Sequence, residues 1–150
     1  MSEQRYLLDT VTVSKLSAEQ LQSAVVRNQS HIPEEIMYEL KDNHNFALLI
    51  DLKMEISAKY LEYVRRVLGL LADDDHILDL NNNEGNGDIT LLAYAKCKMS
   101  EEVGTLFPET WVIVSDDTRL HEVASELNVA VRNTDEFVAI LSSSIEKVKA

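Results

Sequence analysis

Acidic side chains border apolar segments at several points in this chain, and they are the residues best suited to chemistry. The positions are Asp9, Glu39, Asp88 and the pair Asp116 and Asp117. A carboxylate beside a hydrophobic core is costly unless it is paired, hydrogen-bonded or bound to a metal ion. Several carboxylates in one pocket repel each other, and Mg²⁺ or Mn²⁺ is the natural partner for such hard oxygen ligands. Taken together, the residues favour a divalent-metal site.

Each acidic position also has an ordinary structural explanation. Asp9, Asp88 and Asp117 stand where helices begin, and Asp is a preferred N-cap. Glu39 can be a solvated helix residue. Only the recurrence of the arrangement favours metal binding over coincidence.

The segment Trp111–Leu127 shows most clearly how such groups are positioned. Its apolar run, Trp111–Val114, predicts a strand buried on both faces. The polar residues Ser115, Asp116 and Asp117 end that run, and apolar spacing over residues 120–127 then predicts an amphipathic helix. The acids therefore follow the carboxyl end of a core strand, which is where ligands bind in open α/β sheets.

The rest of the chain alternates in the same way. We expect further strands at Arg5–Asp9, His76–Leu80 and Asn128–Val131, and leave Phe46–Ile56 ambiguous between strand and helix. Helices are expected to begin at Ser17, His31–Glu35, Ser57, Asp88, near Ser100–Phe107, and at Asn133. Pro33 suits the first turn of the second helix, and Asn133 with Glu136 makes a capping box for the last one. In the helix from Ser57 the residues expected to face inward are Leu61, Val64, Leu68 and Leu71. This pattern predicts a single domain over residues 1–150. The fold class is α/β, a three-layer α/β/α sandwich around a mainly parallel sheet of four to five strands.

Composition limits the surroundings of the protein. No apolar run approaches the roughly 20 residues needed to span a bilayer, so we expect no membrane association. The first residues lack a secretion signal, and the single cysteine, Cys97, fits a reducing cytoplasm. The net charge of −12 is unusual for a nucleic-acid binder. It suggests either a basic protein partner or carboxylates that hold cations, which then meet phosphates.

The ordered set of motifs resembles the PIN domain, the family of VapC-type toxins and ribosomal-RNA-processing nucleases. The resemblance extends from about Tyr6 to Leu141. It rests on Leu7-Leu8-Asp9-Thr10, Ile32-Pro33-Glu34-Glu35-Ile36-Met37-Tyr38-Glu39-Leu40, Gly87-Asp88-Ile89-Thr90-Leu91-Leu92-Ala93-Tyr94-Ala95 and Val112-Ile113-Val114-Ser115-Asp116-Asp117-Thr118-Arg119-Leu120.

This resemblance implies a metal-dependent endoribonuclease that uses Mg²⁺ or Mn²⁺ and leaves a 5′-phosphate and a 3′-hydroxyl. The implied catalytic and metal-binding residues are Asp9, Glu39, Asp88 and Asp117, with Asp116 as a further metal ligand and Thr10 and Ser115 in support. Arg119 and Lys96 are candidates for contacting RNA phosphates. The resemblance also implies a homodimer and an antitoxin-like protein partner.

Three other functions are alternatives to the nuclease. A catalytically inactive PIN-like module would use the same sheet edge to dock a basic protein partner. A phosphate-accepting receiver-like domain needs paired acids after the first strand, where Asp9 stands alone. A dinucleotide site needs a glycine-rich turn after that strand, and the chain has none there.

Overall fold

The structure of the chain is a computed structural model that describes residues 3–72 and 87–149, with side chains described for residues 3–70 and 89–143. These residues form an α/β fold with a five-stranded sheet in which every neighbouring pair is parallel. The strand order is β3-β2-β1-β4-β5. The strands are β1 (Gln4–Leu8), β2 (Ser30–Pro33), β3 (Lys53–Met54), β4 (Thr110–Val114) and β5 (Ala130–Arg132).

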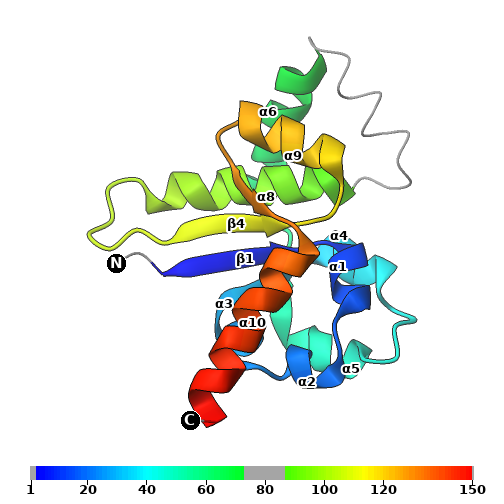
Figure 1. Ribbon diagram of the computed structural model, residues 1–150. Coiled ribbons are helices and arrows are strands. Elements are labelled where there is room, and N and C mark those ends of the chain that lie inside the picture. The colour runs from blue at the N-terminus through cyan, green and yellow to red at the C-terminus, as the bar shows by residue number, and fades with distance from the viewer. Residues whose placement is uncertain (1–2, 73–86, 150) are drawn as a thin grey trace.

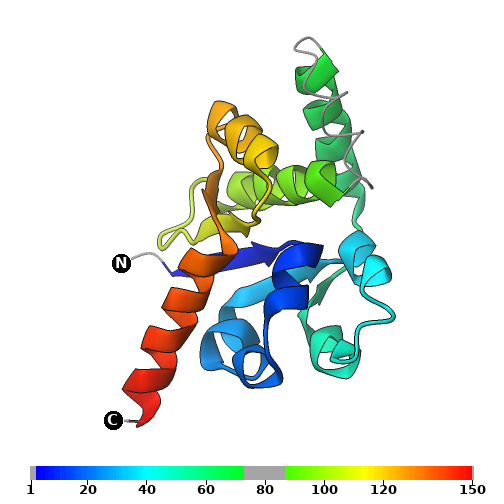
Figure 2. The same cartoon turned by 45° about the vertical axis from the view of Figure 1, so that its right-hand side comes forward.

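Helices cover both faces of the sheet and make the three-layer sandwich that the alternation predicts. They are α1 (Thr10–Lys15), α2 (Ala18–Leu21), α3 (Ala24–Gln29), α4 (Glu34–Glu39), α5 (Phe46–Leu49), the 3₁₀ turn η1 (Ile50–Leu52), α6 (Ala58–Ala72), α8 (Gly87–Glu102), α9 (Thr118–Glu126) and α10 (Thr134–Lys149). α6, α8 and α9 lie on one side of the sheet, and α1, α2, α3 and α10 lie on the other (Figures 1 and 2).

β1 is the central strand, and its register with β4 positions the candidate site. Leu8, the last residue of β1, pairs with Val114, the last residue of β4, and both side chains are buried. The two strands therefore end at the same level. Asp9 and Ser115, the next residue of each strand, consequently emerge side by side at the carboxyl edge of the sheet.

Several predicted elements are confirmed. The apolar run before Ser115 is the core strand β4, and the helix after it is α9, which buries Leu120 and Val123. The capping box that opens α10 is also present. Asn133 Oδ1 accepts the Glu136 amide at 2.8 Å, and the Asn133 amide donates to Glu136 Oε1 at 3.0 Å.

The segment before α4 is a strand, and the prediction of a helix start at His31–Glu35 was wrong. β2 occupies Ser30–Pro33, pairs with β1, and buries Ile32 completely. A four-residue strand ending in proline carries almost no periodicity, and Pro33 caps α4 instead of lying within its first turn. The ambiguous stretch Phe46–Ile56 contains α5, η1 and the short edge strand β3.

Three helix predictions also need correction. The helix expected from Ser17 is two helices, because Ser23 starts a new one after α2. Leu61 of α6 is 53% exposed, whereas Tyr60 and Val67 are buried. α8 continues to Glu102, so the separate helix expected over Ser100–Phe107 does not form.

Two further expectations concern the strand at His76–Leu80 and membrane-spanning helices. The strand expected at His76–Leu80 lies outside the described residues. None of the helices in the described parts of the chain combines the length and apolar character that crossing a bilayer requires.

Candidate functional site: carboxylates at the carboxyl edge of the sheet

Asp9 is held at the end of β1 by hydrogen bonds to both of its carboxylate oxygens. Oδ1 accepts the backbone amide of Thr10 at 2.7 Å, which caps α1. Oδ2 accepts the hydroxyl of Ser115 at 2.8 Å across the β1–β4 pair. The structural role of a cap and the predicted functional position therefore coincide in one side chain.

Ser115 links Asp9 to Asp117. Its side chain is fully buried, and while its hydroxyl donates to Asp9 its oxygen accepts the Asp117 amide at 3.2 Å. Asp117 in turn caps α9, because its Oδ1 accepts the amides of Arg119 at 2.9 Å and Leu120 at 3.4 Å. The supporting role predicted for Ser115 has a clear geometric basis in these contacts.

Glu39 reaches the same edge from α4. Its Oε2 accepts the hydroxyl of Thr10 at 2.7 Å, so Thr10 contacts Asp9 through its backbone and Glu39 through its side chain. The last turn of α4 is thereby joined to the first turn of α1. Thr10 thus has the supporting position that was expected of it.

The electrostatics of Asp9 show that three of these carboxylates share one region. Burial raises the pKa of the Asp9 carboxyl, and the negative charges of Glu39 and Asp117 raise it further, against the hydrogen bonds from Ser115 and Thr10. Burial and like charges both disfavour the ionised form. Asp9, Glu39 and Asp117 are therefore close enough for the charges of Glu39 and Asp117 to act on Asp9.

Asp116 is turned away from this group. Lys15 donates to its carboxylate at 2.8 Å, and the amide and hydroxyl of Thr134 each donate at 2.8 Å. The Lys15 ammonium, with help from Thr134, lowers the pKa of Asp116 to about 2. Asp116 therefore ties the loop after β4 to α1 and α10, and the structure does not bring it to Asp9 as the predicted metal ligand.

Asp88 lies in the first turn of α8, and its side chain is outside the described residues. That turn is nevertheless anchored close to α4. The hydroxyl of Thr90 donates to Oε2 of Glu35, and the hydroxyl of Tyr60 donates to Oε1 of Glu35 at 3.3 Å. Burial raises the pKa of Tyr60 to about 12, so it remains a donor.

Glu35 is a part-buried carboxylate near the site that the sequence reasoning missed. The sequence pattern places Glu35 only within the expected helix start at His31–Glu35. Its spacing from Glu39, one helical turn further along α4, is the signal that could have singled it out, because residues four apart share a helix face.

His121 supports the same loop. Its Nε2 lies 2.6 Å from the backbone oxygen of Ser115, so the ring N–H donates a hydrogen bond to that carbonyl. This contact braces the residue that links Asp9 to Asp117.

The two candidate phosphate contacts lie in different places. Arg119 is exposed in the first turn of α9, next to Asp117. Lys96 donates to the backbone oxygen of Leu127 at 2.8 Å, and Leu127 precedes β5 at the amino edge of the sheet. The structure therefore brings Arg119 to the acidic group and not Lys96.

The oxygen atoms of these side chains are of the kind that bind a hard divalent cation. Asp9, Glu39 and Asp117 supply carboxylate oxygens, and the charges of Glu39 and Asp117 add to burial in raising the pKa of Asp9. Among the described side chains, no three His, Cys, Asp or Glu residues are close enough as they stand to hold a metal ion. The side chain of Asp88 is outside that set.

No model of a known protein family matches the sequence, and no curated protein matches it.

Proposed function

We propose that this chain is a metal-dependent endoribonuclease of the PIN-like kind. The observation that carries the proposal is the convergence of Asp9, Glu39 and Asp117 at one sheet edge, where burial raises the pKa of Asp9 and the other two charges add to that rise. In parallel α/β sheets this edge is where ligands bind. A divalent cation at this edge would offset the like charges of the three carboxylates.

In this proposal the chain's own residues do the positioning. Asp9, Glu39, Asp117 and Asp88 hold Mg²⁺ or Mn²⁺. When bound, such a cation lowers the pKa of a water molecule and offsets charge that develops on the scissile phosphate. Ser115 fixes the rotamer of Asp9 through its hydrogen bond.

Arg119 and Lys15 have separate roles in this proposal. Arg119, exposed beside Asp117, contacts an RNA phosphate. The Lys15 ion pair holds Asp116 away from the site.

The proposal extends to the surroundings of the enzyme. A single buried thiol, Cys97, suits a reducing cytoplasm. The net charge of −12 favours an antitoxin-like or other basic protein as a regulatory partner, and a homodimer would set two acidic groups in one particle. Light scattering of the purified protein measures whether the homodimer forms.

A catalytically inactive module that docks a basic protein is the second candidate. The observation that favours it is that Asp9 and Asp117 both already serve as helix caps with well-formed hydrogen bonds. In that case millimolar metal leaves the melting temperature unchanged and no RNA is cut.

Thermal melting in EDTA, Mg²⁺ or Mn²⁺, followed by cleavage of a labelled RNA, tests the proposal. Metal that binds only the folded state raises the melting temperature by mass action. We expect this rise in the wild type and in Asp116→Asn, and its loss in Asp117→Asn. Asparagine caps helices about as well as aspartate, so Asp117→Asn should still fold.

The neighbouring variant Asp116→Asn is the matched control, because it removes an adjacent carboxylate that is not in the group. Cleavage should follow the same pattern as the metal shift. Equal cleavage by the wild type and Asp117→Asn would overturn the nuclease proposal.

A further inference from the structure

Glu35 lies on α4, one helical turn before Glu39, and contacts two other helices. The hydroxyl of Thr90, in the first turn of α8, donates to its Oε2. The hydroxyl of Tyr60, on α6, donates to its Oε1 at 3.3 Å. The two oxygens of one carboxylate therefore join α4 to both α6 and α8.

These three side chains form a closed cluster, because the Tyr60 hydroxyl also lies 3.4 Å from the Thr90 hydroxyl. Thr90 is buried, and a buried hydroxyl needs a hydrogen-bond partner. A hydrogen bond to a carboxylate is stronger than one between neutral groups. Glu35 therefore supplies the stronger of the two contacts that hold the Thr90 hydroxyl.

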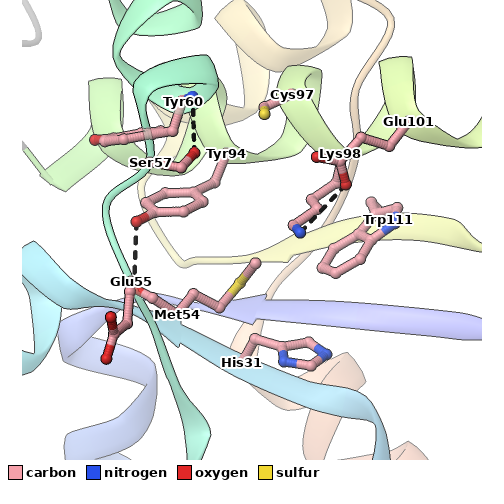
Figure 3. A pocket seen from close by; sticks show the side chains of 10 residues that line it. All are labelled: His31, Met54, Glu55, Ser57, Tyr60, Tyr94, Cys97, Lys98, Glu101 and Trp111. Atoms are coloured by element: carbon pink, nitrogen blue, oxygen red, sulfur yellow. Dashed lines mark hydrogen bonds and ion pairs between the residues drawn. The ribbon is translucent and has the colours of Figure 1, made fainter.

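Tyr60 has a fixed position in this cluster. Its amide donates to the Ser57 hydroxyl oxygen at 3.1 Å, and its ring stacks on that of Tyr94 with the centroids 3.9 Å apart (Figure 3). Tyr94 is held in turn by a 3.2 Å hydrogen bond from its hydroxyl to the backbone oxygen of Met54. Glu35 therefore meets a rigid hydrogen-bond donor on α6.

The same short helix carries Glu39 to the acidic edge of the sheet. Oε2 of Glu39 accepts the Thr10 hydroxyl at 2.7 Å, and the Thr10 amide donates to Asp9. Residues four apart lie on one face of a helix. α4 is a single helix of six residues, so its two carboxylates link α1, at the acidic edge, to the start of α8 through one rigid element.

We propose that Glu35 is a positioning residue for the acidic edge. Its hydrogen bond from Thr90 sets where the first turn of α8, which carries Asp88, stands relative to Glu39. This inference rests on the proposed nuclease, in which Asp88 and Glu39 hold the same cation. Glu35 acts through Thr90 and touches neither the cation nor the RNA.

Binding of Mn²⁺ alone to the full-length protein, measured by electron paramagnetic resonance of the free ion, tests this role. We expect Glu35→Ala to weaken Mn²⁺ binding about tenfold or more, as is usual when a residue that supports a metal ligand is lost. Glu35→Gln should bind much more tightly than Glu35→Ala, because its amide oxygen still accepts the Thr90 hydroxyl. Both variants lose one negative charge, so equal weakening in the two would assign the effect to charge and overturn the positioning role.

Glu34→Ala is the matched control. Glu34 is the neighbouring residue of α4 and is half-buried like Glu35, but its carboxylate accepts the Ile56 amide at 2.9 Å. The control variant therefore loses the same charge from the same helical turn without losing a contact to Thr90. We expect Mn²⁺ affinity close to that of the wild type. Equal losses in Glu34→Ala and Glu35→Ala contradict the proposal.

Thr90→Val tests whether the two residues act through their shared hydrogen bond. This variant removes the hydroxyl and nearly keeps the shape of the side chain. Residues that act through one contact show non-additive effects. Glu35→Ala should therefore weaken Mn²⁺ binding far less in the Thr90→Val background than in the wild type. Additive losses in the double variant would overturn the proposed link.

Hydrogen exchange in the metal-free protein separates this inference from the nuclease. In an α-helix the amides of residues 91–94 bond to the carbonyls of residues 87–90, so their exchange reports on the first turn of α8. We expect faster exchange in Glu35→Ala, and wild-type exchange in Glu34→Ala, with circular dichroism to check that both variants fold.

The two proposals fail in different ways. A wild type that binds no Mn²⁺ overturns the nuclease, whereas faster exchange in Glu35→Ala would still support the placement of α8 by Glu35. Unchanged exchange in Glu35→Ala, with Mn²⁺ binding intact in the wild type, overturns the positioning role of Glu35 and leaves the nuclease standing.

Discussion

The hydroxyl of Ser115 donates a 2.8 Å hydrogen bond to Oδ2 of Asp9 and so joins the ends of β4 and β1, which are 106 residues apart in the sequence. Because the Ser115 oxygen also accepts the Asp117 amide, one buried hydroxyl organises two of the three converging carboxylates. Carboxylate ligands need such partners to hold their orientation.

Ser115→Ala should therefore weaken both the fold and the site. Removing a buried hydrogen bond to a charged group costs about 1–3 kcal/mol, which urea denaturation measures. Loss of a supporting contact of this kind lowers metal affinity or activity by about 10–100-fold. Ser14→Ala is the control, because Ser14 donates to the Thr10 carbonyl from an exposed position. A similar loss of activity in Ser14→Ala would argue against a specific role for Ser115.

Asp9→Asn should make the protein more stable and less active. The raised pKa of Asp9 means that the wild type loses stability as the pH rises from about 3.8 through the folded-state pKa. Asparagine has no charge to lose and still caps α1. We expect a higher melting temperature than the wild type at neutral pH, a difference that shrinks below about pH 4, and no RNA cleavage. A variant that melts below the wild type at neutral pH contradicts the electrostatic account.

Asp116→Asn should show the opposite pH dependence. The Lys15 ammonium lowers the pKa of Asp116 to about 2, so the ionised group stabilises the fold above about pH 3.8 and loses that effect as the pH falls toward 2. The variant should melt below the wild type at neutral pH, and the two curves should converge in acid. Curves that stay equally far apart down to pH 2 would mean that the ion pair is not the cause.

His31 should cause a further loss of wild-type stability in acid, in addition to the loss caused by Asp116. Its pKa is lowered from about 6.5 to about 4, so the stability contributed by the neutral ring is lost as the pH falls through this range. His31→Phe keeps an aromatic ring against Trp111 and cannot titrate. Urea midpoints measured at about pH 7 and about pH 4.5 should fall less in the variant than in the wild type. Arg5, Lys98 and Glu109, the charged groups that act on His31, stay the same in both proteins.

The core of the fold could be predicted from sequence wherever the elements were long and strongly patterned. The β4–α9 unit was predicted because an apolar run changes to helical spacing at Ser115. β2 was missed because four residues ending in Pro33 show too little periodicity to distinguish a strand from a helix start. In α6 the buried residues are Tyr60 and Val67. The rotation of this helix is set by the hydrogen bond from the Tyr60 amide to Ser57 and by the stacking of Tyr60 on Tyr94. The spacing of apolar residues alone does not predict these two contacts.

The sequence predicts only some of the residues that meet at the acidic edge. Asp9 and Asp117 were predicted because residues that follow strands in matching register meet at one edge. Asp116 and Asp117 are adjacent in sequence, yet one contacts Lys15 and the other lies near Asp9. Successive side chains in extended backbone point to opposite sides, so only the tertiary structure decides which of the two faces the group.

The central place of β1 has a consequence for synthesis of the protein on the ribosome. β1 precedes the other described strands in the sequence, yet one of its two neighbours, β4, begins only at Thr110. At about 5–20 residues per second, the nascent chain waits on the order of 4–15 s between the completion of β2 and the arrival of β4. During that interval the apolar Tyr6-Leu7-Leu8 edge lacks the strand that pairs with it and is open to wrong partners.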